Sequence, residues 1–485
     1  MASPGGIEPP TPGLGNLCSV RLSYGDVGPT PIIVAEKRQP DCQPRAPPAK
    51  PRVLNADFEP MTAASTTPSA RRILIASFVG TAIEFYDFYI YATAAALVIG
   101  PIFFPAGQPG VQTLQAFATF AIAFVARPVG AAAFGHFGDR VGRKATLVAS
   151  LMIMGVSTVL IGCLPGYAVI GWWAPALLCL LRFGPGLGFG GEWGGAALLA
   201  VENAPPGRRA LYGMFPQLGA PVGFISANLL FLGLSVGLSQ EAFESWGWRL
   251  PFLASAALIA VGLYVRLKLT ETPAFRAMLA EAPPERVPLA TIFTEHLRPT
   301  LLGTFAMAAA YAVFYLATVF ALSYGTATLG YPRKTFLLLE CVAALFMVLA
   351  IPLSGAAADR FGRRPVMLSG LAFTGLLGLL IGPLLGGEGG VAPVLAYLCL
   401  SLLAMGWIFG PLGALLPELF PTRVRYTGAS VSYNLAGILA ASGAPFAAQW
   451  LTGWGGVAWV GLYLAGAAAI SLAAVALMPE TGRRG

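Results

Sequence analysis

Five ionisable residues lie inside long apolar runs in the first half of the sequence: Glu84, Asp87, Arg127, Arg182 and Glu192. If such a run crosses a membrane, an ionisable side chain in it costs at least about 2.5–3.5 kcal/mol, so it needs a partner or a function. Three carboxyl groups accompany two guanidinium groups, which leaves one acid in excess. A buried acid without a cation has to be neutralised by a proton. Glu84, Asp87 and Glu192 are therefore candidates for binding and releasing a proton.

The two arginines point to a second kind of chemistry, the binding of an anion. A guanidinium group holds a carboxylate through two parallel hydrogen bonds, which are strong and selective in a dry cavity. Tyr91 extends the helix face that the first two acids share. We therefore expect Arg127, Arg182 and Tyr91 to bind a small carboxylate-bearing metabolite, anionic or zwitterionic. The alternative is a static lattice of ion pairs, with Glu192 placed among glycines that allow tight helix packing.

Depth along the runs predicts which of these charges meet. At about 1.5 Å per residue, Glu84, Arg127 and Glu192 lie roughly 14–16 Å from one side of the membrane. On the same scale Asp87 lies at about 21 Å. Arg182 is in the far half of its run, so its nearest acid is expected to be Asp87. Arg127 is then expected to meet one of the other two acids.

The elements that carry these residues are apolar helices. The chain has 485 residues, of which 56% are hydrophobic and 11% charged, with a mean hydropathy of +0.71. A soluble protein carries about 25% charged residues. A span needs about 20 apolar residues, and we count twelve such runs, at 73–104, 113–135, 145–164, 174–202, 210–235, 249–268, 300–322, 335–357, 366–386, 393–416, 426–451 and 457–478. We predict an all-α polytopic membrane protein with twelve transmembrane helices.

The remaining composition argues against other classes of site. Four of the six cysteines lie in apolar runs without CxxC spacing, and the two histidines lie in loops, so we expect no disulfide, metal or cofactor. With no metal-ligand set and no Ser/Lys pair in a span, an enzyme is not expected. The net charge of +8 is explained by basic loops and does not indicate nucleic acid.

A repeated motif divides the twelve runs into two six-helix halves. Gly135-His-Phe-Gly-Asp139-Arg140-Val-Gly-Arg143-Lys144 returns 220 residues later as Gly355-x-x-x-Asp359-Arg360-x-Gly-Arg363-Arg364. Two copies this far apart indicate that the chain has two similar halves. The predicted parts are a disordered Pro-rich cytoplasmic tail (1–70), a first half (71–268), a central cytoplasmic loop (269–299), a second half (300–478) and a cytoplasmic tail (479–485).

Lys and Arg set the predicted orientation. With the N-terminus inside, the cytoplasmic ends and loops from Arg71 onward hold 19 basic residues, against three on the outer side, at Arg249, Arg333 and Lys334. The positive-inside rule then places both termini in the cytoplasm.

Acids at matching helix ends suggest a gate on the cytoplasmic face. Spans four and ten end in Glu202 and Glu418, and each is followed by arginines. We expect these groups to pair with the two Asp-Arg loops and to hold the halves together when the outer side is open. The alternative is orientation by positive charge together with solvation of helix ends. The predicted gating set is Asp139, Arg140, Arg143, Glu202, Asp359, Arg360, Arg363, Glu418 and Arg423.

The paired loops resemble the major facilitator superfamily, and finer motifs are similar to its metabolite:proton symporter family. These motifs are Glu84-Phe-Tyr-Asp87-Phe-Tyr, Ala126-Arg127-Pro128, Gly190-Gly-Glu192-Trp-Gly-Gly195, Phe215-Pro-Gln217-Leu-Gly219 and Pro417-Glu418-Leu-Phe-Pro-Thr-Arg423-Val-Arg425. The resemblance covers about 71–478 and is greatest to enterobacterial inner-membrane metabolite transport proteins. The sequence departs from it at Pro185, where relatives commonly carry Gln.

The resemblance implies proton-coupled uptake by a monomer in the bacterial inner membrane. Relatives carry dicarboxylates, tricarboxylates, shikimate, proline or betaine. The expected partners are a small-molecule substrate, protons and the lipid bilayer. A uniporter, a proton-coupled efflux carrier and a transporter-like sensor remain alternatives.

The second half carries few buried charges. We expect Glu340, about five residues inside its run, to lie near the outer interface and to be solvated. Tyr311, Tyr315 and Asn434, together with Gln217 of the first half, are candidate substrate-binding residues. For the two tyrosines, core packing or contact with lipid is the alternative.

Overall fold

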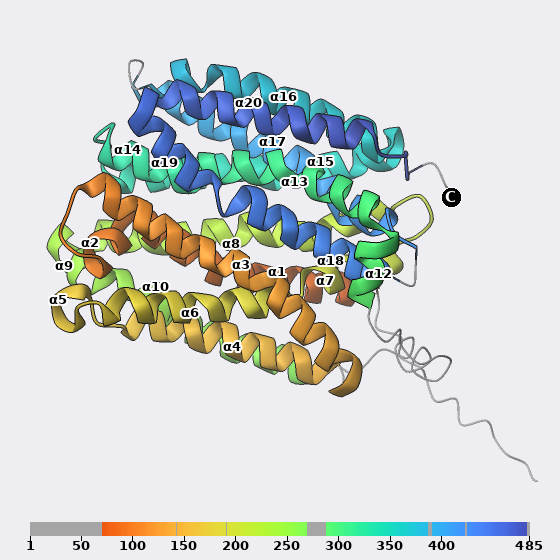
Figure 1. Cartoon of the computed structure of the whole chain (residues 1–485), viewed down its shortest axis with the longest axis horizontal. Coiled ribbons are helices and arrows are strands. Elements are labelled where there is room, and N and C mark those ends of the chain that lie inside the picture. Colours follow the sequence, from red (N-terminus) through yellow and green to blue (C-terminus); the bar gives the residue numbers. More distant parts are fainter. Residues whose placement is uncertain are drawn as a thin grey trace, which may run out of the picture. The chain divides into compact units, whose positions relative to one another are not determined.

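A computed structural model gives the fold of one compact unit, Ser65–Gly485. It describes residues 70–141, 143–190, 192–268, 288–386, 390–421 and 424–482, with the side chains of 70–73, 76, 135–147, 199, 265–268 and 288–290 excluded. Within these ranges every regular element is a helix (Figure 1). The predicted N-terminal tail up to residue 69, most of the central loop and the last three residues lie outside the described part.

The first half of the chain supplies the helices of six spans. Apolar runs form them because a chain in lipid has to satisfy its backbone hydrogen bonds internally. Their bounds are α1 Ala70–Ala94, η1 Ala95–Ile99 and α2 Gly100–Phe103, α3 Pro109–Val141, α4 Arg143–Cys163, α5 Tyr167–Ile170, α6 Trp173–Gly190 and α7 Trp193–Glu202, α8 Arg209–Gly237, α9 Gln240–Ser245, and η2 Gly247–Arg249 with α10 Leu250–Lys268.

The second half supplies the other six. Their bounds are α13 Leu297–Tyr315 with η3 Leu316–Phe320 and α14 Ala321–Ala327, α15 Arg333–Phe361, α16 Arg363–Leu385, α17 Val391–Glu418, α18 Arg425–Ala436 with η4 Gly437–Ala441 and α19 Ala444–Gly455, and α20 Val457–Ala476. One short helix, α12 Pro288–Glu295, falls in the stretch predicted as loop. It begins at a proline, whose fixed φ suits the first helical position.

Nine of the described helical stretches are each long and apolar enough to cross a membrane. The other three predicted spans also fold as helices. The third contributes the shorter apolar stretch Val148–Cys163, while the fourth and eleventh are each built from separate helices, α6 with α7 and α18 with α19. Pro185 does not end α6, which continues to Gly190.

The same helix pairings recur in the two halves. In the first half α1 packs on α8, α3 on α6 and α4 on α10; six spans later α13 packs on α18, α15 on α17 and α16 on α20. Between the halves, α8 contacts α15 and α17, and α3 contacts α18 and α19. The predicted fold of twelve transmembrane helices in two pseudo-symmetric halves is therefore confirmed.

The helix bundle has two chemically different ends. We call the end where α8 begins and α15 finishes the basic end, because it holds Arg208, Arg209, Arg360 and Arg363. The opposite end carries α2, α5, α9 and α14 (Figure 1). The α8/α15 pair runs from one end to the other, and we call it the α8/α15 seam.

Candidate substrate and proton site

Arg127 lies in the middle of α3 and is enclosed by aromatic rings. Its side chain is 1% exposed, and its guanidinium carbon is 4.6, 4.3 and 4.2 Å from the ring centroids of Phe88, Phe124 and Phe189. Stacking over a ring face stabilises a desolvated cation by about 2 kcal/mol. The Nε–H of Arg127 has no hydrogen-bond partner.

Arg182 on α6 is held in the same way. It is 1% exposed, and its guanidinium carbon lies 3.7 Å from the ring centroid of Tyr91 and 5.6 Å from that of Phe88. Neither Nε nor Nη2 of Arg182 has a hydrogen-bond partner. The Tyr91 hydroxyl is fixed by Thr119 at 2.5 Å. Because Phe88 contacts both guanidinium groups, the two arginines share one site, which we call the arginine cage.

The predicted pairing of Arg182 with Asp87 is wrong. Asp87 is 1% exposed, and its Oδ1 accepts a hydrogen bond of 2.5 Å from the Ser255 hydroxyl on α10, while its Oδ2 has no partner. Among the described residues neither arginine forms an ion pair with it. Successive helix residues differ by about 100° in direction, so Asp87 faces α10 while its neighbour Phe88 faces the cage.

The other two acids, Glu84 and Glu192, lie on two different spans. Glu84 is 2% exposed on α1, one turn before Asp87. Glu192 is half-buried and immediately precedes α7, where span four is interrupted.

Ser255, the partner of Asp87, was not predicted from the sequence, because a serine in an apolar run carries no signal of its own.

The predicted tyrosines of the second half close the cage from the other side. Tyr311 and Tyr315 are buried and stacked, with ring centroids 6.3 Å apart. Tyr315 also meets the rings of Phe120 and Phe124 on α3 edge to face, at 5.5 and 5.7 Å. Burial excludes the lipid-facing alternative for both tyrosines, and the contacts join the two halves at the level of the arginines.

Gln217 and Asn434 also link the halves. Gln217 accepts from the Trp193 indole at 3.0 Å and donates to the Phe409 carbonyl at 3.1 Å. Asn434 donates to the Gly190 carbonyl at 3.0 Å. Trp193, in the Gly-rich motif of span four, was not among the predicted site residues. Its ring stacks on that of Tyr433, 3.9 Å away, which adds a further contact between the halves.

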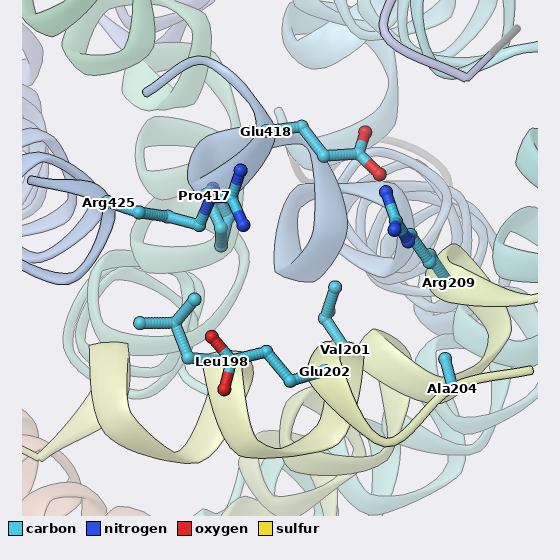
Figure 2. A pocket seen from close by; sticks show the side chains of 8 residues that line it. All are labelled: Leu198, Val201, Glu202, Ala204, Arg209, Pro417, Glu418 and Arg425. Atoms are coloured by element: carbon cyan, nitrogen blue, oxygen red, sulfur yellow. The ribbon is translucent and has the colours of Figure 1, made fainter. Parts of the chain in front are cut away.

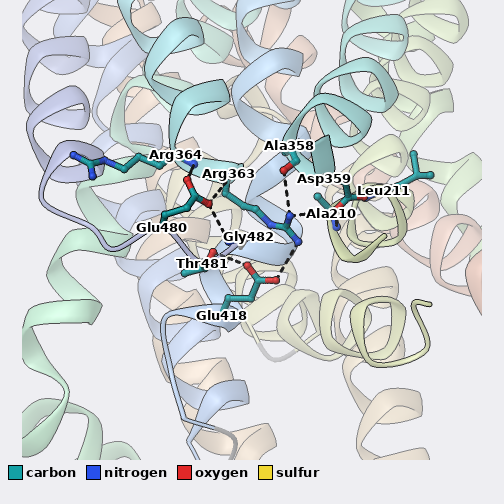
Figure 3. Close-up of polar contacts among 10 residues, drawn as sticks. All are labelled: Ala210, Leu211, Ala358, Asp359, Arg363, Arg364, Glu418, Glu480, Thr481 and Gly482. Carbon is teal, nitrogen blue, oxygen red and sulfur yellow. Dashed lines mark hydrogen bonds and ion pairs between the residues drawn. The ribbon is translucent and has the colours of Figure 1, made fainter. Parts of the chain in front are cut away.

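At the basic end Asp359 holds the two halves together. Its two carboxylate oxygens accept the backbone N–H groups of Ala210 and Leu211 at 2.9 Å each (Figure 3). These N–H groups open α8, where helix geometry leaves them without intrahelical partners and the helix dipole favours an anion. We call this contact the Asp359 latch. Within the described part of the first half, the contact that Asp359 makes is therefore with a helix N-terminus and not with an arginine.

Arg363 supports the latch from within the second half. It pairs with Asp359 at 3.2 Å and with Glu418 at 3.3 Å (Figure 3). The C-terminal segment adds to this network, because Glu480 accepts the Arg363 backbone N–H at 2.9 Å and Thr481 donates to Glu418 at 2.6 Å. The predicted pairing of Glu418 with an Asp-Arg loop is thus present.

A cavity of about 190 Å³ opens beside the latch between the halves. Glu202 and Arg209 of the first half face Arg425 and Glu418 of the second across it (Figure 2). Of the other predicted gating residues, Arg360 is exposed and lies over the ring of Phe361. The side chains of Asp139, Arg140 and Arg143, and the whole of Arg423, lie outside the described residues.

The sequence matches the model of the family described as sugar (and other) transporter over residues 73–284 and 297–484. The chain belongs to this family. Its members are membrane transporters, so the chain is a multi-pass transporter of a sugar or another metabolite, in agreement with the expectation that it is not an enzyme.

Similar proteins within the family indicate which kind of transporter the chain resembles. The chain is 57% identical over 418 residues to the inner membrane metabolite transport protein YhjE of Escherichia coli, covering 85% of this chain and 95% of the relative. It is 37% identical to the shikimate transporter of E. coli, over the same shares of the two chains. It is 33% identical to the proline/betaine transporter of Salmonella typhimurium, over 79% of this chain and 77% of the relative.

Solved structures agree on the fold. The major facilitator superfamily proton:xylose symporter XylE superposes with a TM-score of 0.67 at 16% identity, covering 85% of this chain and 96% of that one. A partially occluded, inward-open XylE from E. coli gives 0.65. These matches show that the chain has the fold predicted from its resemblance to the major facilitator superfamily. The match to metabolite transport proteins agrees with the narrower resemblance.

Proposed function

We propose that the chain takes up a small carboxylate-bearing or zwitterionic metabolite together with protons. The observation that carries this proposal is the arginine cage, in which Arg182 keeps two N–H nitrogens without partners in dry, aromatic surroundings. Buried donors of this kind are costly unless something satisfies them. A carboxylate supplies two acceptor oxygens and a charge of the right sign.

The cage also sets the shape of the substrate. Tyr91 and Phe88 wall it on the side of the first half and Tyr315 on that of the second, so the rest of the molecule would pack on aromatic faces. Shikimate, proline and betaine, the substrates named for two of the relatives, all contain a carboxylate. A hydrophobic cation would leave both arginines without a binding role.

Asp87 is the acid that we propose for proton coupling. It shares α1 with Phe88 and Tyr91, the rings on which both guanidinium groups rest. A carboxylate can only accept from Ser255, whereas the protonated acid can also donate. Gain of a proton therefore changes how α1 is held to α10, and the rings on α1 transmit that change to the arginines. Glu84 and Glu192 remain alternative carriers of the proton.

Transport would proceed by alternating access between two ends that close in turn. We place the basic end in the cytoplasm, with both termini there, because of the excess of Lys and Arg. The inner-membrane location named for the E. coli relative supports the same location here. We propose a monomer as the working unit, with the Asp359 latch closing the cytoplasmic side.

Uptake by purified protein in liposomes with an imposed pH gradient tests this proposal. The panel would include labelled mono-, di- and tricarboxylates, shikimate, proline and betaine. We expect one of them to accumulate, and a protonophore to abolish the accumulation. Accumulation that persists with a protonophore would indicate a uniporter, and export from preloaded vesicles would indicate an efflux carrier.

Variants of Arg182 test whether the arginine cage binds the substrate or has a structural role. Arg182→Gln should remove binding of the accumulated compound, while Arg182→Lys should weaken it because a point charge replaces a planar fork. Arg298→Gln, which removes an exposed arginine at the start of α13, is the matched control and should transport normally. If a neutral or cationic compound accumulates and Arg182→Gln still carries it, the arginines are structural and the proposal is wrong.

A further inference from the structure

Glu340 on α15 is buried between the two halves near the opposite end. Sequence depth predicted a solvated acid, but its side chain is 1% exposed. The amide of Asn228 on α8 donates to its Oε2 at 2.7 Å, and its Oε1 has no hydrogen-bond partner. The prediction failed because distance from a helix end does not tell which neighbour the residue faces, and this one faces the other half.

The same two helices that form the Asp359 latch form this contact. Asp359 lies 19 residues after Glu340 on α15, and Ala210 lies 18 residues before Asn228 on α8. At about 1.5 Å per residue the two contacts are separated by roughly 27–29 Å on each helix. The α8/α15 seam is thus joined by an acid of α15 near each of its ends.

The two acids differ in what neutralises them. Asp359 has Arg363 at 3.2 Å and a helix N-terminus. Glu340 meets one neutral amide, and within the described part of the chain no cation pairs with it. A buried carboxylate without a cation is strongly disfavoured, whereas the protonated acid accepts the Asn228 hydrogen bond through its carbonyl oxygen at no such cost.

The charged groups around this contact are already engaged elsewhere. Arg333, two turns earlier on α15, donates to Ser235 on α8 at 2.8 Å. Its guanidinium group also stacks over Phe243, 3.5 Å from the ring centroid, and the acid near this guanidinium group is Glu244. The titratable neighbour of Glu340 itself is the thiol of Cys341.

Asn228 also connects the contact to the proton site. The hydroxyl of Thr93 on α1 donates to Asn228 Oδ1 at 2.9 Å, and α1 carries Asp87. The amide is therefore oriented from one side by Thr93 and offers its N–H to Glu340 from the other.

We propose that Glu340 is a second proton-binding group, which closes the opposite end of the transporter when it carries a proton. When that end opens, water reaches Glu340, the proton leaves the carboxyl oxygen, and the resulting carboxylate resists being buried again against Asn228. The proton returns to the solution from which it came, so Glu340 controls closure and does not carry the transported proton. The inference rests on the alternating access of the proposed function, with the opposite end facing outward.

Distance measurements on the full chain in lipid nanodiscs test this without any substrate. Nitroxide labels at Val236→Cys on α8 and Leu338→Cys on α15, both exposed positions on the same two helices toward this end, report its opening. The native cysteines are replaced by serine or alanine. As the pH falls from 9 to 5, the ratio of closed to open molecules should grow, by up to about tenfold per pH unit for one proton.

Three variants decide between a proton switch and a structural contact. Glu340→Gln keeps the hydrogen-bond acceptor but cannot titrate, so it should stay closed at every pH. Glu340→Asp should retain a pH response, and Glu241→Gln, which removes an exposed acid on α9 at the same end, should behave as the parent does. Glu340→Asp and Glu241→Gln both keep a titratable acid at position 340, so they can still be measured if Glu340→Gln does not fold.

A parental pH response in Glu340→Gln, an end that stays open in that variant, or a parent without any pH response would each overturn the proposal. Because no substrate is present, these results do not depend on whether a carboxylate is the compound transported. Failure of the substrate panel would likewise leave them intact.

Discussion

Asp359→Asn should open the basic end of the transporter. The carboxylate is 10% exposed and accepts two backbone N–H groups from the start of α8. A net contribution of about 1.5–3 kcal/mol is typical of one hydrogen bond to a charged group, and a helix N-terminus adds about 0.3–1 kcal/mol. Because the two bonds share one carboxylate and are not additive, we expect the latch to contribute about 2–4 kcal/mol to the closed state. An asparagine keeps the size but loses the charge and one acceptor.

This free energy converts into a population that can be measured. A loss of about 2–4 kcal/mol raises the open fraction at the basic end roughly 30- to 1,000-fold, as long as the end remains mostly closed. Met214, on α8 against Gly355 of α15, is 6% exposed and becomes reachable when the seam separates there. The rate at which a maleimide alkylates Met214→Cys, in a chain without its native cysteines, should rise by the same factor.

The neighbouring arginine provides the control. Arg360→Gln removes a charge from the same turn, but Arg360 is exposed and its described contact is with Phe361. Its alkylation rate should equal that of the parent. If Asp359→Asn leaves the rate at Met214→Cys unchanged, the hydrogen bonds to α8 do not hold this end closed, and the gating argument has to be abandoned.

Three further predictions concern transport and packing. Asp87→Asn should abolish proton-driven accumulation while the protein stays folded and in the membrane; uphill uptake by this variant would transfer the coupling role to Glu84 or Glu192. Asp359→Ala should slow transport without changing which substrates compete, as measured by initial rates and competition, since the latch is remote from the cage. Gly413→Ala should raise the Met214→Cys alkylation rate, because the added Cβ would lie 2.2 Å from the Gly213 carbonyl oxygen of the other half. An unchanged rate would mean that α17 moves away from α8 without opening the α8/α15 seam.

The fold was predictable because the lengths of the apolar runs and the repeated Asp-Arg loop can be read directly from the order of residues. The membrane requires each span to be a helix, and the duplication requires two halves. The breaks within spans four and eleven were not predicted, since glycine-rich apolar stretches satisfy a hydropathy count whether or not the helix is continuous.

The site was predictable in its members and less so in its contacts. Arg127 and Arg182 were found because a charge in an apolar run is conspicuous, and the structure places both in one cage. The estimated depth of Asp87 in the membrane could not reveal that its side chain faces Ser255. Depth gives the position along the helix axis and not the direction in which a side chain points. The same limit hid the partner of Glu340, which comes from a helix more than a hundred residues earlier.

The positions of Asp359 and Glu340 near the two ends of one seam have a mechanical consequence. If α15 rocks on α8 about a point midway between them, each contact lies at the end of a lever of about 14 Å. A rotation of about 10° then displaces each end by roughly 2.5 Å, which stretches a 2.9 Å hydrogen bond far beyond the distance at which it stabilises anything. Access can therefore change sides with a small tilt between two rigid halves, and no helix has to unwind for it.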